Sequence, residues 1–290
     1  MMILLISFLT LFVFISRLKE DSYHKIPEEQ SNGKTVVEKE RIQRFWDVYR
    51  QAAKYRIAGK PDEAAGKYLK AIELNNQHED ALYYLGNMYV ELDEFEAAEQ
   101  TWKHLIKVNP SSTRAHVQLG MLYLLFPHEA LFNIDAAETE FQRALAINKE
   151  ATTPLLRLGQ IELIRGNLFE SQRLLDAVIR SNQRSVESHF LRGYIDWKRK
   201  NPQKALTFLL KAGENSRPLA TVQDFSGEGD TKTGHITGLS GNRGMLFDVF
   251  FENLSDLKET DFSQEMYRRY RKLDMFLEQI RKKNQNGNET

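Results

Sequence analysis

The chain contains no cysteine in its 290 residues. Disulfide bonds, cysteine nucleophiles, thiolate zinc sites and lipid attachment at a cysteine are therefore excluded. A net charge is also lacking, because 40 Lys and Arg residues balance 40 Asp and Glu residues. No charge excess favours nucleic acid or acidic substrates, so no nucleic-acid partner is expected. The compartment stays open, since cysteine-free proteins occur in oxidising and reducing surroundings.

Catalytic and metal-binding motifs are missing as well. The seven histidines form no His-x-x-x-His or His-Glu-x-x-His pair, and no Gly-x-Ser-x-Gly elbow is present. In the glycine-rich stretch Leu219–Gly244, Asp230 and Thr231 precede Lys232 where a phosphate-binding loop requires glycine. The acidic residues of this stretch do not have EF-hand spacing. The sequence therefore predicts no enzyme activity, no metal and no cofactor; an enzyme built on this loop is only a third hypothesis.

Charged side chains are absent from residues 1–16, MMILLISFLTLFVFIS. As a helix this segment would span about 24 Å, somewhat less than the roughly 30 Å core of a bilayer. A secretory signal would have a basic start and a small-x-small cleavage site, and both are missing. Arg17 and Lys19 follow and favour a cytoplasmic downstream side. We predict that residues 1–16 anchor the protein in a membrane. A cleaved signal and a buried helix are the alternatives, and the side of the membrane stays open.

A period of 34 residues runs through the middle of the chain. It separates Ala52 from Gly86, Gly86 from Gly120, and Gly159 from Gly193, and the step from Gly120 to Gly159 is one period with an insertion of five. A small residue recurs twelve positions after each of these alanine or glycine positions, or seventeen positions after Gly120, where the insertion intervenes. These small residues are Ala64, Ala98, Ala137, Ser171 and Ala205. Four positions further on stand larger residues: Tyr68, Trp102, Phe141, Leu175 and Leu209.

Each period predicts a helical hairpin, with apolar residues at helical spacing on both sides of a polar turn. The small residues let helix A approach helix B, and the larger residue fills the gap beside the crossing. A single hairpin cannot bury its own apolar face, so the hairpins must stack. The pattern resembles the tetratricopeptide repeat, whose signature is matched by Leu85, Gly86, Tyr89, Ala98, Trp102 and Pro110. The predicted fold class is all-α, a right-handed α-solenoid of about five such hairpins with a C-terminal helical cap.

The predicted organisation has six parts. The hydrophobic segment 1–16 is followed by a flexible linker at 17–36, and a helix starts near Val37. The array covers 37–217, with repeats at about 45–78, 79–112, 113–151, 152–185 and 186–217, and the insertion lengthens a turn around Phe126–Asn133. The glycine-rich loop 218–244, a helical cap at 245–283 and a disordered tail at 284–290 complete the chain. The basic residues of the last helix indicate either a solvated face or contact with anionic lipid or RNA.

The resemblance implies an interaction scaffold whose A helices line a concave groove. Carried over to this sequence, the groove positions are Trp46, Tyr49, Tyr83, Asn87, Val90, Val117, Met121, Leu124, Leu156, Gln160, Leu163, Phe190, Tyr194 and Trp197. Some members clamp a C-terminal carboxylate with Lys and Asn on successive A helices. Tyr49 and Ala53 stand at those positions here, which argues against such a clamp.

These residues form an apolar, aromatic surface that suits a protein or peptide partner. The first hypothesis is a membrane-anchored scaffold that recruits other proteins through the groove. The alternative is an exported or periplasmic accessory subunit, a chaperone-like protein that holds segments of exported chains. The occupant of the groove could also be the chain's own C-terminal helix over Met245–Leu257, whose apolar residues suit that place.

Overall fold

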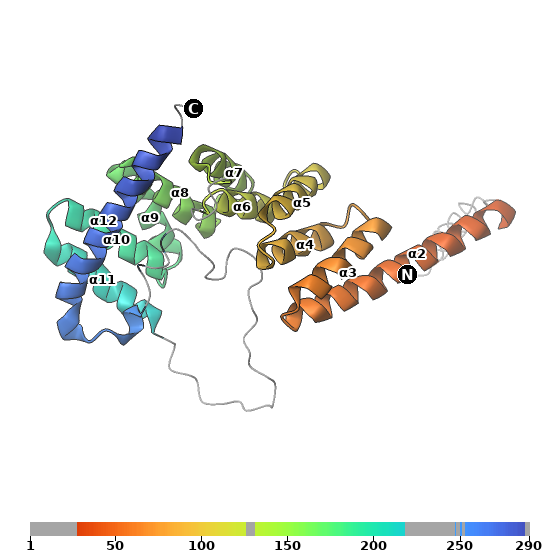
Figure 1. The fold of residues 1–290 in the computed structure, drawn as a ribbon, viewed down its shortest axis with the longest axis horizontal. Helices are drawn as coiled ribbons and strands as arrows, with labels where there is room; N and C mark the ends of the chain where they lie inside the picture. Colours follow the sequence, from red (N-terminus) through yellow and green to blue (C-terminus); the bar gives the residue numbers. More distant parts are fainter. Residues whose placement is uncertain (1–27, 126–130, 218–246, 248–249, 251–252, 288–290) are drawn as a thin grey trace, which may run out of the picture.

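The computed structural model describes residues 28–125, 131–217, 247, 250 and 253–287. In these parts the chain forms consecutive antiparallel helical hairpins and a long C-terminal helix (Figure 1). The helices of the hairpins pair as follows: α2 (Glu28–Ile57) with α3 (Pro61–Leu74), α4 (Glu79–Glu91) with α5 (Phe95–Val108), α6 (Thr113–Leu122) with α7 (Ile134–Ile147), α8 (Thr152–Arg165) with α9 (Leu168–Ser181), and α10 (Val186–Lys198) with α11 (Pro202–Ser216). The predicted fold class, an all-α solenoid of about five hairpins, is confirmed.

The first helix of each hairpin, helix A, packs closely on the second, helix B. A Cβ atom built on Gly86 of α4 would lie 2.3 Å from Nε1 of Trp102 in α5, and one on Gly120 would lie 2.7 Å from the Phe141 ring. Only glycine therefore allows the buried aromatic ring of helix B to lie against helix A. The small residues twelve or seventeen positions after the repeat position, Ala64, Ala98, Ala137, Ser171 and Ala205, all have an exposed fraction of 0%.

The turns between helix A and helix B share one backbone feature. A residue with positive φ stands in four of these turns: Gly59 (+67°), Asp93 (+59°), Gly166 (+86°) and Lys200 (+60°). Such a left-handed residue ends a helix and reverses the chain within a few residues. In the third hairpin α6 ends early at Leu122, and the inserted residues lie between it and α7.

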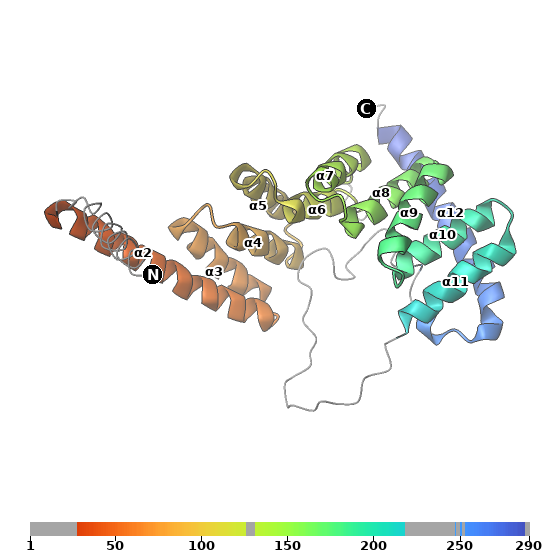
Figure 2. The ribbon, with the colours of Figure 1, turned by 180° about the vertical axis from the view of Figure 1, so that it is seen from behind.

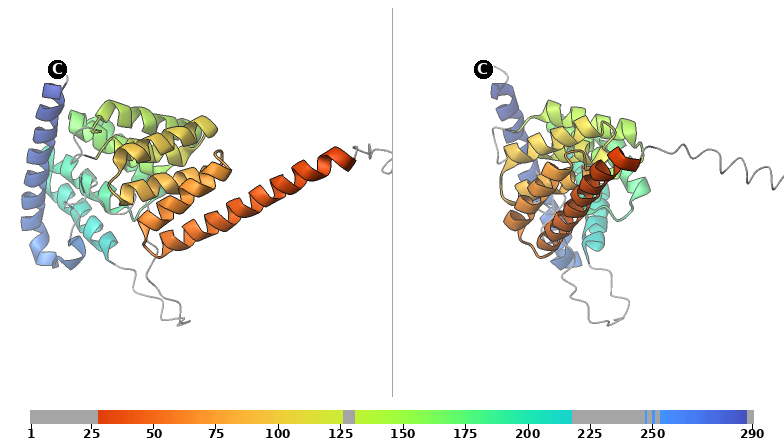
Figure 3. Two further views of the ribbon diagram at one scale, coloured as in Figure 1. Left: turned by 45° about the vertical axis from the view of Figure 1, so that its right-hand side comes forward. Right: turned by 90° about the vertical axis from the view of Figure 1, so that its right-hand side faces the viewer.

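Helix α2 begins at Glu28, inside the segment where we expected a flexible linker. Its first part projects beyond α3 at the opposite end of the array from α12 (Figure 3). The projecting part exposes Val36, Val37 and Ile42, and the helix becomes buried at Phe45.

The C-terminal part consists of two short 3-10 helices, η2 (Leu254–Asp256) and η3 (Glu259–Asp261), and α12 (Phe262–Gly287). The helix expected over residues 245–257 lies partly outside the described residues, and in the part that is described Asn253 has a left-handed backbone with φ +54° just before η2. Helix α12 lies in front of α10 in Figure 1 and behind it in Figure 2, so it covers one face of the last hairpins. It packs against α8 and α11.

The prediction of a membrane-anchored protein is corrected by the structure. Among the helices described, none combines the length and the apolar character needed to cross a bilayer. The longest, α2, carries charged residues along its length, which are costly inside a membrane. The predicted anchor at residues 1–16 and the glycine-rich loop at 218–244 lie outside the described residues.

Candidate functional site

Thirteen of the fourteen residues predicted to line a groove lie on the five A helices α2, α4, α6, α8 and α10, and Leu124 lies in the turn directly after α6. We call the side of these helices that carries them the A-helix face. Trp46 is 43% exposed. Half-buried members of the set are Tyr49, Tyr83, Val117, Leu156 and Trp197, whereas the buried members are Asn87, Val90, Met121, Leu124, Gln160, Leu163, Phe190 and Tyr194. Accessible side chains are therefore richest at the N-terminal end of the face.

An aromatic cluster forms that N-terminal end. The ring of Trp46 meets Tyr49 edge-on with centroids 5.7 Å apart, and both rings pack around His78, at 5.5 and 5.2 Å. Burial raises the pKa of Tyr49 to about 12 and lowers the pKa of His78. Both side chains are therefore neutral at neutral pH, and the cluster is a largely uncharged aromatic surface.

The polar neighbours of the cluster hold the next tyrosine in place. The guanidinium of Arg114 lies over the Tyr83 ring, 4.6 Å from its centroid, and also pairs with Asp80. Gln118 donates a hydrogen bond from Nε2 to the Tyr83 hydroxyl at 3.2 Å. Because Arg114 and Gln118 belong to the next repeat, these contacts fix the register between the second and third hairpins.

At the other end of the A-helix face, one carboxylate of α12 binds two side chains of α10. Asp274 accepts hydrogen bonds from the Tyr194 hydroxyl at 2.7 Å and from the Lys198 ammonium at 2.8 Å. Burial alone would raise the pKa of Asp274, but these two hydrogen bonds outweigh it and lower the pKa. Burial and the same carboxylate raise the pKa of Tyr194. Two residues predicted to face a partner, Tyr194 and Phe190, thus contact the chain's own C-terminal helix.

Helix α12 is also held at both ends. Near its start, the Phe262 ring packs closely on α11. A Cβ atom built on Gly213 of α11 would lie 2.5 Å from that ring. Near its end, Arg281 donates from Nε to the Ile164 carbonyl at 2.5 Å and from Nη2 to the Leu163 carbonyl at 2.8 Å. These are carbonyls of the last turn of α8, where Leu163 also accepts from the N–H of Gly166 at 3.1 Å. The arginine therefore caps the C-terminal end of an A helix two repeats away.

The sequence predicted a helical cap over residues 245–283 but not which residues of the array it contacts. Local spacing does not distinguish Tyr270 from its apolar neighbours, or Arg281 from the rest of the basic run in the last helix. Within that run Arg268 and Arg269 pair with Glu265, whereas Arg271, Lys272 and Lys282 are exposed. The contacts of α12 join residues about 80 to 118 positions apart in sequence, which no local pattern encodes.

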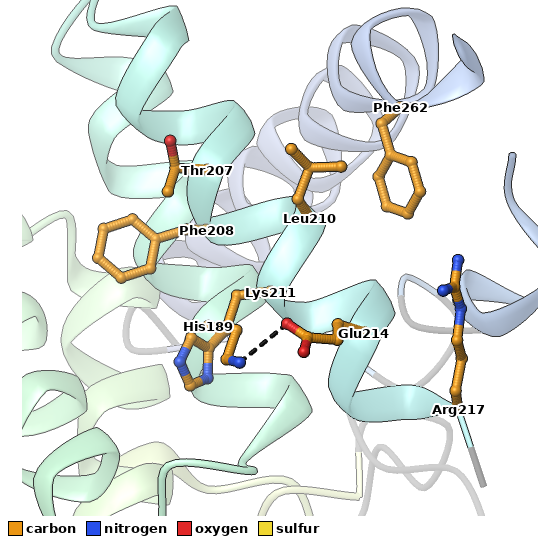
Figure 4. A pocket seen from close by; sticks show the side chains of 8 residues that line it. All are labelled: His189, Thr207, Phe208, Leu210, Lys211, Glu214, Arg217 and Phe262. Atoms are coloured by element: carbon orange, nitrogen blue, oxygen red, sulfur yellow. Dashed lines mark hydrogen bonds and ion pairs between the residues drawn. The ribbon is translucent and has the colours of Figure 1, made fainter. Parts of the chain in front are cut away.

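A second surface feature is an open pocket on α10 and α11, with a volume of about 510 Å³ (Figure 4). Phe208 and Phe262 supply apolar walls at opposite ends, and His189 lies beside Phe208. The ammonium of Lys211 is paired with Glu214 at 2.8 Å, which offsets its charge. Within the part of the chain that the structure describes, no group of three His, Asp or Glu residues could hold a metal ion.

The fold and face together define a class of protein, the helical-repeat solenoids that present a row of A helices. Comparison with known proteins specifies the repeat: residues 55–120 and residues 156–217 match two sequence models of the tetratricopeptide repeat. A comparison with curated proteins found no match. Both halves of the array are therefore similar to tetratricopeptide repeats, which the sequence pattern also resembles.

Several solved structures have a similar fold. MamA 41-end from Desulfovibrio magneticus RS-1 is similar with a TM-score of 0.52 and 15% identity, over 60% of this chain and 97% of that one. A tetratricopeptide repeat protein from Parabacteroides merdae has a TM-score of 0.52 and 20% identity, over 82% of this chain and 83% of the other. At such identities the likeness shows the fold alone.

Proposed function

We propose that this protein is an interaction scaffold that binds a protein or peptide partner through the first three A helices. The observation that carries the proposal is the accessible aromatic cluster at this end of the A-helix face. Trp46 is 43% exposed, and Tyr49 and Tyr83 are half-buried beside it. Large aromatic side chains held rigidly at a surface supply much of the binding energy of protein interfaces. Tryptophan and tyrosine lose little conformational entropy when a partner covers them.

The position of α12 on the A-helix face supports this choice of site. In the fifth repeat, α12 already contacts Phe190 and Tyr194, and Trp197 packs near Tyr270 with centroids 6.0 Å apart. A partner of the intact protein would therefore meet its accessible surface on α2, α4 and α6. The contact residues that we propose for this partner are Trp46, Tyr49, Tyr83 and Val117.

The test is partner capture by a variant with Trp46→Ala and Tyr83→Ala. We expect in-cell crosslinking followed by mass spectrometry to lose the specific partners of the wild-type chain, because two aromatic anchors cost about 2 kcal/mol or more each. The matched control replaces Phe169 and Tyr267, which are 77% and 47% exposed outside the A-helix face. Equal capture by both double variants would contradict the proposal. Circular dichroism must show that both variants keep their helices.

A further inference from the structure

The fifth hairpin differs from the others at its helix crossing. In the second, third and fourth hairpins, the glycine of helix A is covered from within the hairpin, by Trp102, Phe141 and Leu175. In the fifth, the corresponding residue is Leu209, and the atom closest to a Cβ on Gly193 would be the hydroxyl oxygen of Tyr270, at 2.2 Å. The array thus has a notch at Gly193 that a side chain from outside the repeat fills.

Tyr270 fills this notch completely. It is 0% exposed, and its hydroxyl donates to the Phe190 carbonyl at 3.2 Å. Its ring packs edge-on against Phe190 and Tyr194, with centroids 5.1 and 5.9 Å apart. A buried ring with a satisfied hydroxyl, set against aromatic neighbours, has the features of an anchor residue in a helix-binding groove.

The remaining contacts fix the register of the helix around this anchor. Asp274, four positions after Tyr270, binds Tyr194 and Lys198, and Arg281, eleven positions after it, binds the end of α8. Residues at these spacings share one face of a helix, with Tyr270 and Arg281 about 16 Å apart along its axis. The same face buries Leu273, Leu277 and Ile280, each 0% exposed.

We propose that the fourth and fifth repeats form an exchangeable helix-binding site, of which α12 is the resident occupant. The partner it fits is an amphipathic helix with tyrosine, aspartate four positions later and arginine eleven positions after the tyrosine. This proposal deepens the proposed function, on which it rests, by naming a second binding surface of the same array and the chemistry of its partner.

Two features of the contacts favour exchange over a permanent cap. Each of the five hairpins has its own A–B contact, so the array does not need α12 to close a hairpin, and solenoid ends depend only on their neighbours. Among the polar groups that α12 engages, the Lys198 ammonium is exposed, and the carbonyls of Leu163 and Ile164 belong to the last turn of α8, beside the turn at Gly166. Water can therefore solvate them when α12 leaves.

The tether favours the resident helix over a free one. Residues 218–246 join α11 to the C-terminal part, and a tethered ligand acts at an effective concentration of about millimolar. A free helix therefore competes poorly with an intact α12 and well with a weakened one. This difference makes the proposal testable in the full-length chain.

The probe is a fluorescein-labelled peptide with the sequence of residues 262–287, and fluorescence anisotropy measures its affinity. We expect the full-length chain with Asp274→Ala and Arg281→Ala to bind this peptide at least about tenfold more tightly than the wild-type chain. Those changes weaken the resident helix and leave Tyr194, Lys198 and the α8 carbonyls intact. The control is Arg268→Ala, whose guanidinium pairs only with Glu265 of the same helix, and it should leave the affinity unchanged. A peptide with Tyr270→Ala should bind to no chain.

Unchanged peptide affinity in the weakened chain, with its helical content intact, would overturn the proposal. Hydrogen exchange of the wild-type chain gives an independent answer if that variant fails to fold. Amide hydrogen exchange in α12 that is at least about tenfold faster than in α10 and α11 supports an exchangeable helix. Equal protection of the three helices shows a permanent cap. The variant with Trp46→Ala and Tyr83→Ala separates the two proposals, because it changes only the N-terminal site. Its affinity for the peptide tests the site on the fourth and fifth repeats, whereas its capture of partners tests the N-terminal site.

Discussion

At the scale of single residues, the helix crossings decide the fold. Trp102 is 0% exposed and donates from Nε1 to the Tyr83 carbonyl at 3.3 Å, so its ring has one position in the core. Gly86 provides the space for that ring. The conjunction of glycine and a large residue sixteen positions later is visible in the sequence, and the structure shows that the two are in contact.

Replacing Gly86 with alanine should therefore destabilise the protein by about 1–3 kcal/mol, the usual cost of overpacking a close-packed core. The new methyl group would lie 2.3 Å from Trp102 Nε1, and the ring has no free space to move into. Urea-induced unfolding followed by circular dichroism measures this change.

Gly66 is the matched control, since a Cβ there would meet nothing within 4 Å. Alanine at this exposed position of α3 should stabilise the protein by about 0.5–1 kcal/mol, because alanine is the better helix former. Destabilisation of the same size at both glycines would show that contact with Trp102 is not the cause.

At the scale of elements, α12 shows where local pattern stops being informative. Its apolar stripe predicted a helix, but Tyr270, Asp274 and Arg281 have meaning only against Gly193, Tyr194 and the end of α8. Helix α2 shows the converse case. Its polar first part carries no apolar stripe, so the sequence indicated a linker, whereas the structure continues the helix back to Glu28.

The docking of α12 should depend on pH through Asp274. Its pKa is lowered in the folded protein, so the unfolded chain binds more protons in the acid range. The stability from this carboxylate is present above its unfolded pKa of about 3.9 and is lost as the pH falls through the lower, folded value. Asp274→Asn should remove that share of the acid sensitivity.

Unfolding by urea at a series of pH values from 7 down to 2.5 measures this dependence. The difference in free energy of unfolding between the wild-type chain and the Asp274→Asn variant should be largest near neutral pH and shrink below about pH 4. A difference that stays constant across the series would contradict the assigned role of Asp274. Glu265, whose pKa its hydrogen bond with Arg268 lowers to about 2, serves as a second titrating site for comparison.

At the scale of the whole molecule, the core is divided. One cluster of buried residues runs from Val90 in the second repeat to Ile280 in α12, and a separate cluster joins the first two repeats. Repeat proteins transmit stability only between neighbours. Damage to the first repeat should therefore remain local, whereas damage to the long cluster should spread.

Tyr68→Ala and Phe141→Ala test this division, since both side chains are 0% exposed and each truncation should cost about 3–5 kcal/mol. Hydrogen exchange with mass spectrometry should show Tyr68→Ala speeding exchange in α2 and α3 while α8 to α12 stay protected. Phe141→Ala should speed exchange from α4 to α12. Faster exchange in α10 after both changes would indicate one undivided core.

The sequence by itself determined the repeat, the hairpins and the stacking, because each depends on spacings within about 34 residues. The resemblance to a known repeat also predicted fourteen candidate contact residues for a groove lined by the A helices. Only the tertiary structure decided which of these remain accessible, since that depends on where α12 lies. The contacts of α12 join residues about 80 to 118 positions apart, and such contacts arise from shape and charge that form only after the array has folded.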